Sequence, residues 1–293
     1  MIYTIVDDIY NNIIPRHITN RRNIKDSKLS DSEIIAISIV GKLLTIDSEK
    51  AFFGLLCREY KYLFPKIGDR TRFNRTKRNL HAVIKEIREY ISLFFQPESD
   101  NIRGVDSMPI PACKFGRAHF SKCFKGEASY ERSSSKKETY FEFKFHVLTT
   151  VKGFITDYVI TPANVDDRSA VWDLCIKYKS LSIIGDKGYT NKRLTPELKN
   201  ERYINLLFLK RGNSKDNYPK EIRQLIFKVR RRIETSFSQL TEQLNLNKVQ
   251  SKSMLGFITR TSIKVLAHNI SFLVNKLMGN SDSMAKIKRL VFG

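Results

Sequence analysis

The hydrophobic pattern of this chain changes twice along its length, and the order of the changes constrains the fold more than any other feature. About the first hundred residues carry apolar side chains at helical spacing. The next part predicts three strands, a helix, a strand, a helix and a strand, and from about Pro219 onward the spacing is helical again. This order predicts a mixed α/β protein preceded by an all-helical segment.

The N-terminal part predicts a succession of helices. Ser30 and Glu33 have the spacing of a capping box ahead of an apolar run. A second helix is expected over residues 47–60. A third is expected from Asp69 to about Phe95, and its first half is rich in arginine and lysine. Such a unit fits a helix-turn-helix DNA-binding domain and, equally well, a plain helical bundle with a basic surface.

Proline and polar residues at 95–101 mark the best candidate for a linker. The predicted domains are therefore residues 1–98 and residues 99–293. After the linker we expect a short strand at 101–113, a hairpin at 141–164, a helix capped by Asp166 or Asp167, a strand at 181–185, a short helix at 191–200, a strand at 203–209, and long helices at 220–245 and 254–278.

Two of the predicted strands end on an aspartate. The apolar, β-prone residues 181–185 stop at Asp186, and Asp106 ends the short apolar step in NIRGVDSMPI. Aspartate is an ordinary strand-ending residue, so either one alone would indicate a turn. Two such carboxylates raise the question of whether they meet at one site.

A third acidic residue lies on a predicted helix. Apolar residues recur at helical spacing in FKVRRRIETSFSQLTEQL, and Glu234 lies at the flank of that stripe. Mg²⁺ prefers oxygen ligands, and two such ions about 4 Å apart can stabilise both the attacking and the leaving oxygen of a phosphoryl displacement. Arg230 precedes Glu234 by one turn, which predicts either a phosphate contact beside a metal site or a weak surface ion pair.

The charge balance points to nucleic acid. The chain has 52 Lys plus Arg against 30 Asp plus Glu, a formal net charge of +22. Such a surplus favours DNA through phosphate neutralisation and counterion release. A coding bias toward lysine explains many lysines equally well, but it explains clustered arginines less well. The expected DNA contacts are Arg70, Arg72, Arg75, Lys77 and Arg78, with Lys187 and the loop at 133–137 as weaker candidates.

Other functional classes find little support. The four cysteines lack a C-x-x-C spacing, so neither a zinc site nor a disulfide framework is indicated. The N-terminus carries acids where a signal peptide would need basic residues, and no apolar run reaches the length of a membrane span. We expect a soluble cytoplasmic protein, associated with the nucleoid and without a membrane partner.

Seven stretches, in their order and spacing, resemble the DDE transposases of bacterial insertion sequences and are most similar to the IS982 family. Each stretch alone is weakly specific, whereas the ordered set covers nearly the whole chain and is specific. The stretches are LSDSEIIAISIVG, IDSEKAFFGLL, LFPKIGDRTRFNRTKRNL, GVDSMPI, TPANVDDRSAVWDL, IIGDKGYTNKRL and RRRIETSFSQLTEQLN.

The resemblance implies a ribonuclease-H-like catalytic core, with a mixed sheet flanked by helices, over residues 99–293. Residues 1–98 would form a helix-turn-helix-like DNA-binding domain. Asp106, Asp186 and Glu234 would be the catalytic, metal-binding triad, with Mg²⁺ as the cofactor and Mn²⁺ as a substitute.

Related transposase groups carry Y-x-x-R-x-x-x-E-x-x-x-x-x-x-K around the third acid. This chain keeps Arg230 and Glu234 but has Phe227 at the tyrosine position and Thr241 at the lysine position. The DNA contacts assigned to that tyrosine and lysine are therefore not carried over to Phe227 and Thr241, whereas the acidic triad is intact.

The implied reaction is an in-line attack on a phosphodiester, first by water and then by a DNA 3′-hydroxyl. One metal between Asp106 and Asp186 would activate the nucleophile, and a second between Asp106 and Glu234 would stabilise the leaving oxygen. The expected partner is double-stranded DNA, both transposon ends and target, bound by a homodimer or larger oligomer. Two alternatives stay open: a ribonuclease-H-fold nuclease that cuts without joining, and a non-catalytic DNA-binding protein derived from a transposase.

Overall fold

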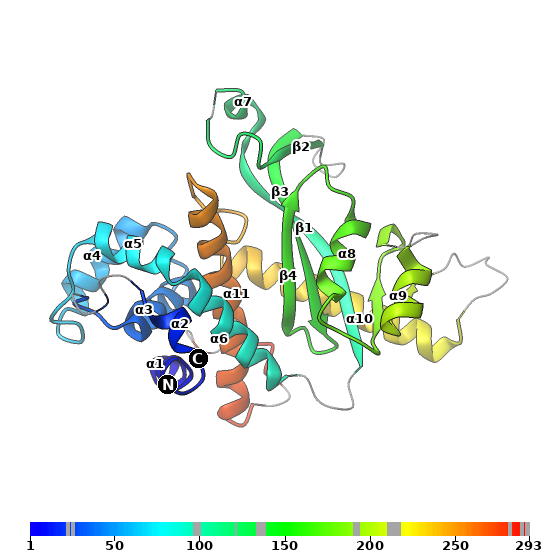
Figure 1. Cartoon of the computed structure of the whole chain (residues 1–293), viewed down its shortest axis with the longest axis horizontal. Coiled ribbons are helices and arrows are strands. Elements are labelled where there is room, and N and C mark those ends of the chain that lie inside the picture. Colours follow the sequence, from blue (N-terminus) through cyan, green and yellow to red (C-terminus); the bar gives the residue numbers. More distant parts are fainter. Residues whose placement is uncertain are drawn as a thin grey trace. The chain divides into compact units, whose positions relative to one another are not determined.

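The computed structural model describes residues 1–21, 24, 27–95, 101–120, 122–132, 139–189, 194–209, 218–280, 283–287 and 290. The chain divides into two compact units. The sheet unit is Phe95–Ser238, and the helical unit combines Met1–Phe94 with Gln239–Gly293. Figure 1 shows the elements of both units along the chain.

The sheet unit contains a six-stranded mixed sheet in the order β2-β3-β1-β5-β6, with β4 also paired to β3. β3 runs antiparallel to β1, β2 and β4, whereas β5 runs parallel to β1 and β6. The predicted hairpin is confirmed as β3 and β4. The strands are β1 (Ile102–Lys114), β2 (Ser129–Arg132), β3 (Thr139–Thr150), β4 (Ile155–Pro162), β5 (Ser182–Gly185) and β6 (Asn205–Phe208).

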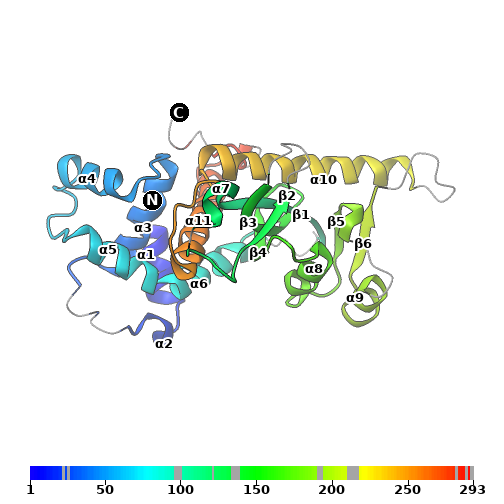
Figure 2. The same cartoon turned by 90° about the horizontal axis from the view of Figure 1, so that it is seen from above.

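Helices cover both faces of this sheet, as Figure 2 shows, with α10 along one face and α8 and α9 along the other. Successive residues of a strand point to opposite faces. Gly104 of β1 accordingly faces Val229 and Ile233 of α10, whereas Val105 packs in the core with Val171 of α8. The helices of this unit are α7 (Phe115–Ala118), α8 (Asp167–Cys175), the 3₁₀ turn η1 (Lys187–Tyr189), α9 (Leu194–Arg202) and α10 (Lys220–Ser238).

The mixed sheet flanked by helices confirms the predicted α/β class and is consistent with a ribonuclease-H-like core. Of the two expected caps for α8, the structure selects Asp166, whose Oδ1 accepts a hydrogen bond of 2.9 Å from the backbone N–H of Arg168.

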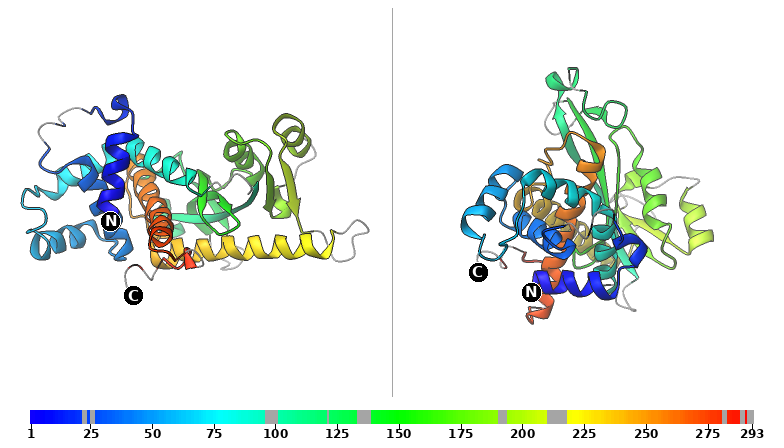
Figure 3. Two further views of the ribbon diagram at one scale, coloured as in Figure 1. Left: turned by 90° about the horizontal axis from the view of Figure 1, so that it is seen from below. Right: turned by 60° about the vertical axis from the view of Figure 1, so that its left-hand side comes forward.

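The helical unit is assembled around α11, whose side chains are buried along most of its length. α11 packs against α3, α5 and α6, and Figure 3 shows it lying beside α6. The helices of this unit are α1 (Ile2–Asn12), α2 (Arg16–Thr19), α3 (Asp31–Leu43), α4 (Glu49–Glu59), α5 (Arg70–Asn79), α6 (His81–Leu93), the π-helical turn η2 (Gln239–Gln243) and α11 (Met254–Leu277).

The compact units differ from the predicted domains at the C-terminal end. Residues 239–293 were expected in the same domain as the sheet, but they group with the N-terminal helices because α11 supplies the buried centre of that unit. The predicted boundary between residues 98 and 99 lies outside the described part of the chain.

The expected capping box is confirmed, since Ser30 Oγ accepts from the N–H of Glu33 at 3.1 Å and Glu33 Oε2 accepts from the N–H of Ser30 at 2.6 Å. The single long helix expected from Asp69 is wrong. The helix stops at Leu80, a buried residue with φ −86° and ψ 9°, and α6 begins after it. Both helices pack on α11, while α5 also contacts α3 and α6 also contacts α1. No helix within the described ranges combines the length and hydropathy needed to cross a bilayer.

Candidate functional site

The parallel pairing of β1 with β5 brings two of the predicted acids to the same edge of the sheet. Gly104 is in register with Ile184, and Asp106 and Asp186 each follow two residues later. Neighbouring strands lie about 4.8 Å apart, and residues two apart point to the same face. Asp106 and Asp186 are therefore neighbours on the face that carries α10.

Helix α10 brings the third acid to this face. A Cβ atom on Gly104 would lie 2.4 Å from Cδ1 of Ile233 and 2.8 Å from Cγ1 of Val229, so the helix rests directly on the backbone of β1. Glu234 follows Ile233 and is exposed at the flank of the buried stripe, as the sequence predicted. The close approach at Gly104 thus holds Glu234 beside the strand that bears Asp106.

Electrostatic coupling within this group appears at Asp106. The pKa of its carboxyl is raised to about 6, mainly by burial and to a smaller extent by the carboxylates of Asp186 and Glu234, while the Ser107 N–H and the Arg230 guanidinium act in the opposite direction. Ser107 donates its backbone N–H to Asp106 Oδ1 at 2.8 Å. Like charges close together disfavour ionisation, so these three acids lie within electrostatic reach of one another.

Arg230 lies among the acids. Its Nη2 is 3.9 Å from Asp186 Oδ1, and its side chain is half-buried. Glu234, in contrast, forms no ion pair with any described residue. Of the two alternatives from the sequence, the surface pair between Arg230 and Glu234 is therefore not formed, and the arginine faces the neighbouring acid of the sheet instead.

Tyr189, which the sequence reasoning did not single out, lies near the acids but packs in the core on the α8 side of the sheet. It is buried at the end of η1, and burial together with the carboxylates of Asp106 and Asp186 raises the pKa of its hydroxyl. Its place in the DKGY stretch, three residues after Asp186, was the available signal.

The donor chemistry of these residues fits a hard divalent cation, which prefers carboxylate oxygens. Burial is the main cause of the raised pKa of Asp106, and the carboxylates of Asp186 and Glu234 make a smaller contribution in the same direction. The side chain of Asp186 is 61% exposed and that of Glu234 is exposed as well, so both have room to rotate. In the described part of the chain, no group of three or more His, Cys, Asp or Glu side chains is already drawn together closely enough to hold a metal.

The expected DNA contacts on α5 separate into two kinds. Arg70, Arg72 and Arg75 are exposed. Lys77 is different, because its Nζ lies 2.6 Å from both carboxylate oxygens of Glu49 and only 4% of the residue is exposed. Its expected role as an open surface contact is therefore replaced by a buried ion pair.

Three further predicted contacts have other outcomes. Arg78 is half-buried and lines a cavity of the helical unit. The side chain of Lys187 and the loop at 133–137 lie outside the described part of the structure. Helix α10 carries additional exposed basic residues, which are Lys220, Arg223, Lys228 and Arg231.

A family model described as "Transposase DDE domain" matches residues 96–254, which is more than half of the chain. The matched range includes Asp106, Asp186, Arg230 and Glu234. Comparison with curated proteins found no match, and comparison with solved structures found none either.

Proposed function

The chain belongs to the transposase DDE domain family, and from this premise we propose that it binds the ends of an insertion sequence, cuts DNA there and joins the cut end to a target. It is a DDE transposase, a polynucleotidyl transferase with endonuclease activity. The observation that supports the proposal is the electrostatic coupling of Asp106 to Asp186, Glu234 and Arg230 at the edge of the sheet where β1 and β5 pair.

In the proposed reaction, an oxygen nucleophile gives up its proton to solvent and attacks phosphorus. The new P–O bond forms in line with the bond that breaks, and the departing 3′-oxygen takes a proton from water. The nucleophile is water for cleavage and a DNA 3′-hydroxyl for joining. Divalent cations held by Asp106, Asp186 and Glu234 would supply Lewis-acid stabilisation of the phosphate oxygens. The protein itself fixes the ligands, because β1 is held between β3 and β5 and the Ser107 N–H orients Asp106.

Arg230 is proposed to bind a non-bridging oxygen of the reacting phosphate. Its guanidinium presents five donors, and the 3.9 Å separation from Asp186 leaves them available for a better acceptor. When cations neutralise the acids, the electrostatic attraction between Arg230 and Asp186 weakens, and the guanidinium can donate hydrogen bonds to the DNA phosphate instead.

The DNA duplex is proposed to contact basic residues of both units. Arg70, Arg72 and Arg75 are exposed on α5, and Arg231 is exposed on α10. Arginine donors suit phosphate geometry, and each neutralised phosphate adds affinity through counterion release.

Finer assignments rest on the resemblance of the sequence motifs. We propose an IS982-type enzyme with a ribonuclease-H-like core, two Mg²⁺ ions (or Mn²⁺) per site, and a homodimer or larger oligomer on DNA. Its place of action would be the cytoplasm, at the nucleoid. Residues 1–98 are proposed to act in DNA binding, by a helix-turn-helix-like mode.

A strand-transfer assay tests joining against cutting alone. A labelled duplex with a pre-cut 3′-hydroxyl end of the element is mixed with supercoiled target plasmid and Mg²⁺. Covalent transfer of the label to the plasmid is expected. Nicking of the plasmid without transfer of the label would indicate a nuclease, and binding without any nicking would indicate a non-catalytic DNA-binding protein.

A further inference from the structure

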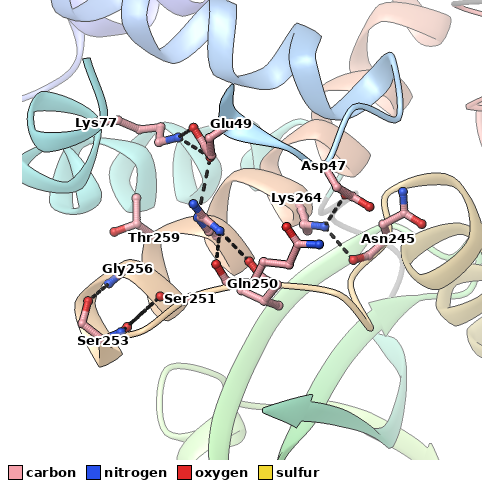
Figure 4. A network of polar contacts seen from close by, with 12 residues as sticks. Asp47, Glu49, Lys77, Asn245, Gln250, Ser251, Ser253, Gly256, Thr259 and Lys264 are labelled. Atoms are coloured by element: carbon pink, nitrogen blue, oxygen red, sulfur yellow. Dashed lines mark hydrogen bonds and ion pairs between the residues drawn. The ribbon is translucent and has the colours of Figure 1, made fainter. Parts of the chain in front are cut away.

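A polar cavity of about 330 Å³ lies within the helical unit, between α5 and the segment that leads into α11. Its charged lining residues are all basic. Figure 4 shows the polar network at this place. The basic lining residues are Arg70, Lys77, Arg78, Lys252 and Arg260.

Two of these cations share one carboxylate. Lys77 Nζ lies 2.6 Å from Glu49 Oε2, and Arg260 Nε lies 3.6 Å from Glu49 Oε1. Arg260 Nη1 also donates to the carbonyl oxygens of Val249, at 2.9 Å, and of Gln250. Its Nη2 donates to no acceptor in the described part of the chain, so a pair of donors is left over.

The other three cations have no acidic partner. Arg70, Arg78 and Lys252 form no ion pair with any described carboxylate. Arg70 and Lys252 are exposed, and Arg78 is half-buried. The rim of the cavity is therefore a set of cations without local neutralisation.

Basic side chains also outnumber acidic ones in the buried cluster next to the cavity. Lys42 and Lys264 are buried close to Lys77 and Arg260, and Asp47 is the second carboxylate of this cluster. The pKa of Lys77 is lowered to about 8, mainly by burial and to a smaller extent by the charges of Lys42 and Arg260, against the attraction of Glu49. Burial also lowers the pKa of Lys264 to about 7 and lowers that of Lys42. Because only two carboxylates face these buried basic groups, an added anion nearby would stabilise their charged forms.

The backbone at the start of α11 also suits an anion. Ser253 caps this helix by accepting from the N–H of Gly256 at 3.3 Å. A Cβ atom on Gly256 would lie 2.7 Å from Ser251 Oγ, so glycine lets the first turn close onto the preceding segment beside the cavity. A 24-residue helix adds a partial positive charge at this end.

We propose that this cavity binds a phosphate of the DNA backbone, gripped between α5 and the start of α11. That the phosphate belongs to DNA rests on the proposed function; that the cavity takes an oxyanion rests on its own charges. One DNA strand would thus contact residues near 70 and residues near 252, two segments that are far apart in the chain. Arg72 and Arg75 do not line this cavity, so we expect Arg70 and Arg78 to contribute more to DNA affinity than they do.

The test uses the full-length chain and a labelled duplex in fluorescence anisotropy, over a series of salt concentrations. The double variant Arg70→Ala/Lys252→Ala removes two exposed, unpartnered cations of the rim and leaves the buried pairs intact. Lys50→Ala/Lys85→Ala is the matched control, because both residues are exposed in the same unit, lie outside the cavity and remove the same charge. Thermal unfolding of both variants verifies the fold.

The rim variant is expected to bind about tenfold or more weakly at moderate salt, and the slope of log affinity against log salt should fall by roughly 0.9 for each lost phosphate contact. The control should change far less. Equal effects of the two double variants would overturn the proposal. A second result would also overturn the proposal. If inorganic phosphate stabilises the wild-type protein against unfolding but the rim variant binds DNA with unchanged affinity, the cavity binds a free anion and not DNA.

Plasmid nicking by the wild-type chain with Mg²⁺ separates this proposal from the function on which it rests. Binding that depends on the rim, in a wild-type protein that cuts no DNA, would refute the transposase reaction and leave the cavity as a DNA site. Nicking that proceeds while the rim variant binds like the control would refute the cavity alone.

Discussion

Gly104 of β1 lies so close to Ile233 of α10 that a Cβ atom there would be 2.4 Å from Cδ1 of the isoleucine. Real Cβ contacts are not this short, so the separation between strand and helix requires glycine at this position. Glu234 follows Ile233 in the chain, and Asp106 follows Gly104 by two residues on the same face of the strand. This contact therefore sets the distance between two of the acids.

Gly104→Ala is expected to push α10 off the strand. The overpacking should cost about 1–3 kcal/mol of unfolding free energy, and we expect cleavage to fall by about tenfold or more because Glu234 moves with the helix. Urea unfolding and plasmid nicking measure the two effects. Gly54→Ala is the control, since a Cβ at that position meets no atom within 4 Å. A Gly104→Ala enzyme with full stability and full cleavage would show that the helix is not held by this contact.

Arg230→Gln is expected to lower cleavage by about 10- to 100-fold while the protein remains folded, because it removes the guanidinium proposed to hold the reacting phosphate. Single-turnover cleavage at saturating enzyme measures this effect apart from DNA affinity. Arg58→Gln, at a side chain that is 73% exposed on α4, is the control and should leave cleavage unchanged. Unchanged cleavage in Arg230→Gln would show that Arg230 does not bind the reacting phosphate and only contacts Asp186.

The stability of the chain is expected to depend on His268 in mildly acidic solution. Burial lowers the pKa of His268 from 6.5 to about 4, and its Nε2 lies 3.1 Å from Gln239 Oε1. The unfolded state takes up this proton near pH 6.5 and the folded state does not, so stability is full above pH 6.5 and falls as the pH drops toward 4. The loss from this one group amounts to about 2 kcal/mol at pH 5.

Unfolding free energies of wild type and His268→Gln at pH 7.5 and pH 5 measure this contribution. The variant should lose about 2 kcal/mol less than wild type between the two pH values. His81→Gln, at an exposed position, is the control and should follow the wild-type curve. Parallel curves for wild type and His268→Gln would contradict the expected burial of a neutral histidine.

Local patterns predicted much of the fold, because capping and strand signals are encoded within a few residues. The capping box at Ser30 and the β3–β4 hairpin are of this kind. The break at Leu80 was missed because the residues on both sides of it have helical patterns and Leu80 itself carries no breaking signal such as proline or glycine. The place of α11 in the helical unit depends on contacts between residues far apart in sequence, which periodicity does not report.

The candidate site was predictable in its acids but not in its geometry. Asp106, Asp186 and Glu234 were identified from strand ends, a helix flank and the resemblance to a family. The role of Gly104 depends on the β1–α10 contact, and the burial of Lys77 depends on a partner, Glu49, that is 28 residues away in sequence. A basic residue buried by such a partner has the same sequence signature as one that faces solvent.

The most direct measurement of the central claim is Mg²⁺-dependent nicking of supercoiled plasmid by Asp106→Asn, Asp186→Asn and Glu234→Gln, each compared with wild type and with Asp173→Asn. Asp173 is exposed on α8, on the opposite face of the sheet from α10, and serves as the matched control. Each triad variant is expected to lose nicking by about 100-fold or more while it still binds DNA, and the control should cut like wild type. Wild-type nicking by any one of the three triad variants would contradict the claim that these three acids form a single catalytic site.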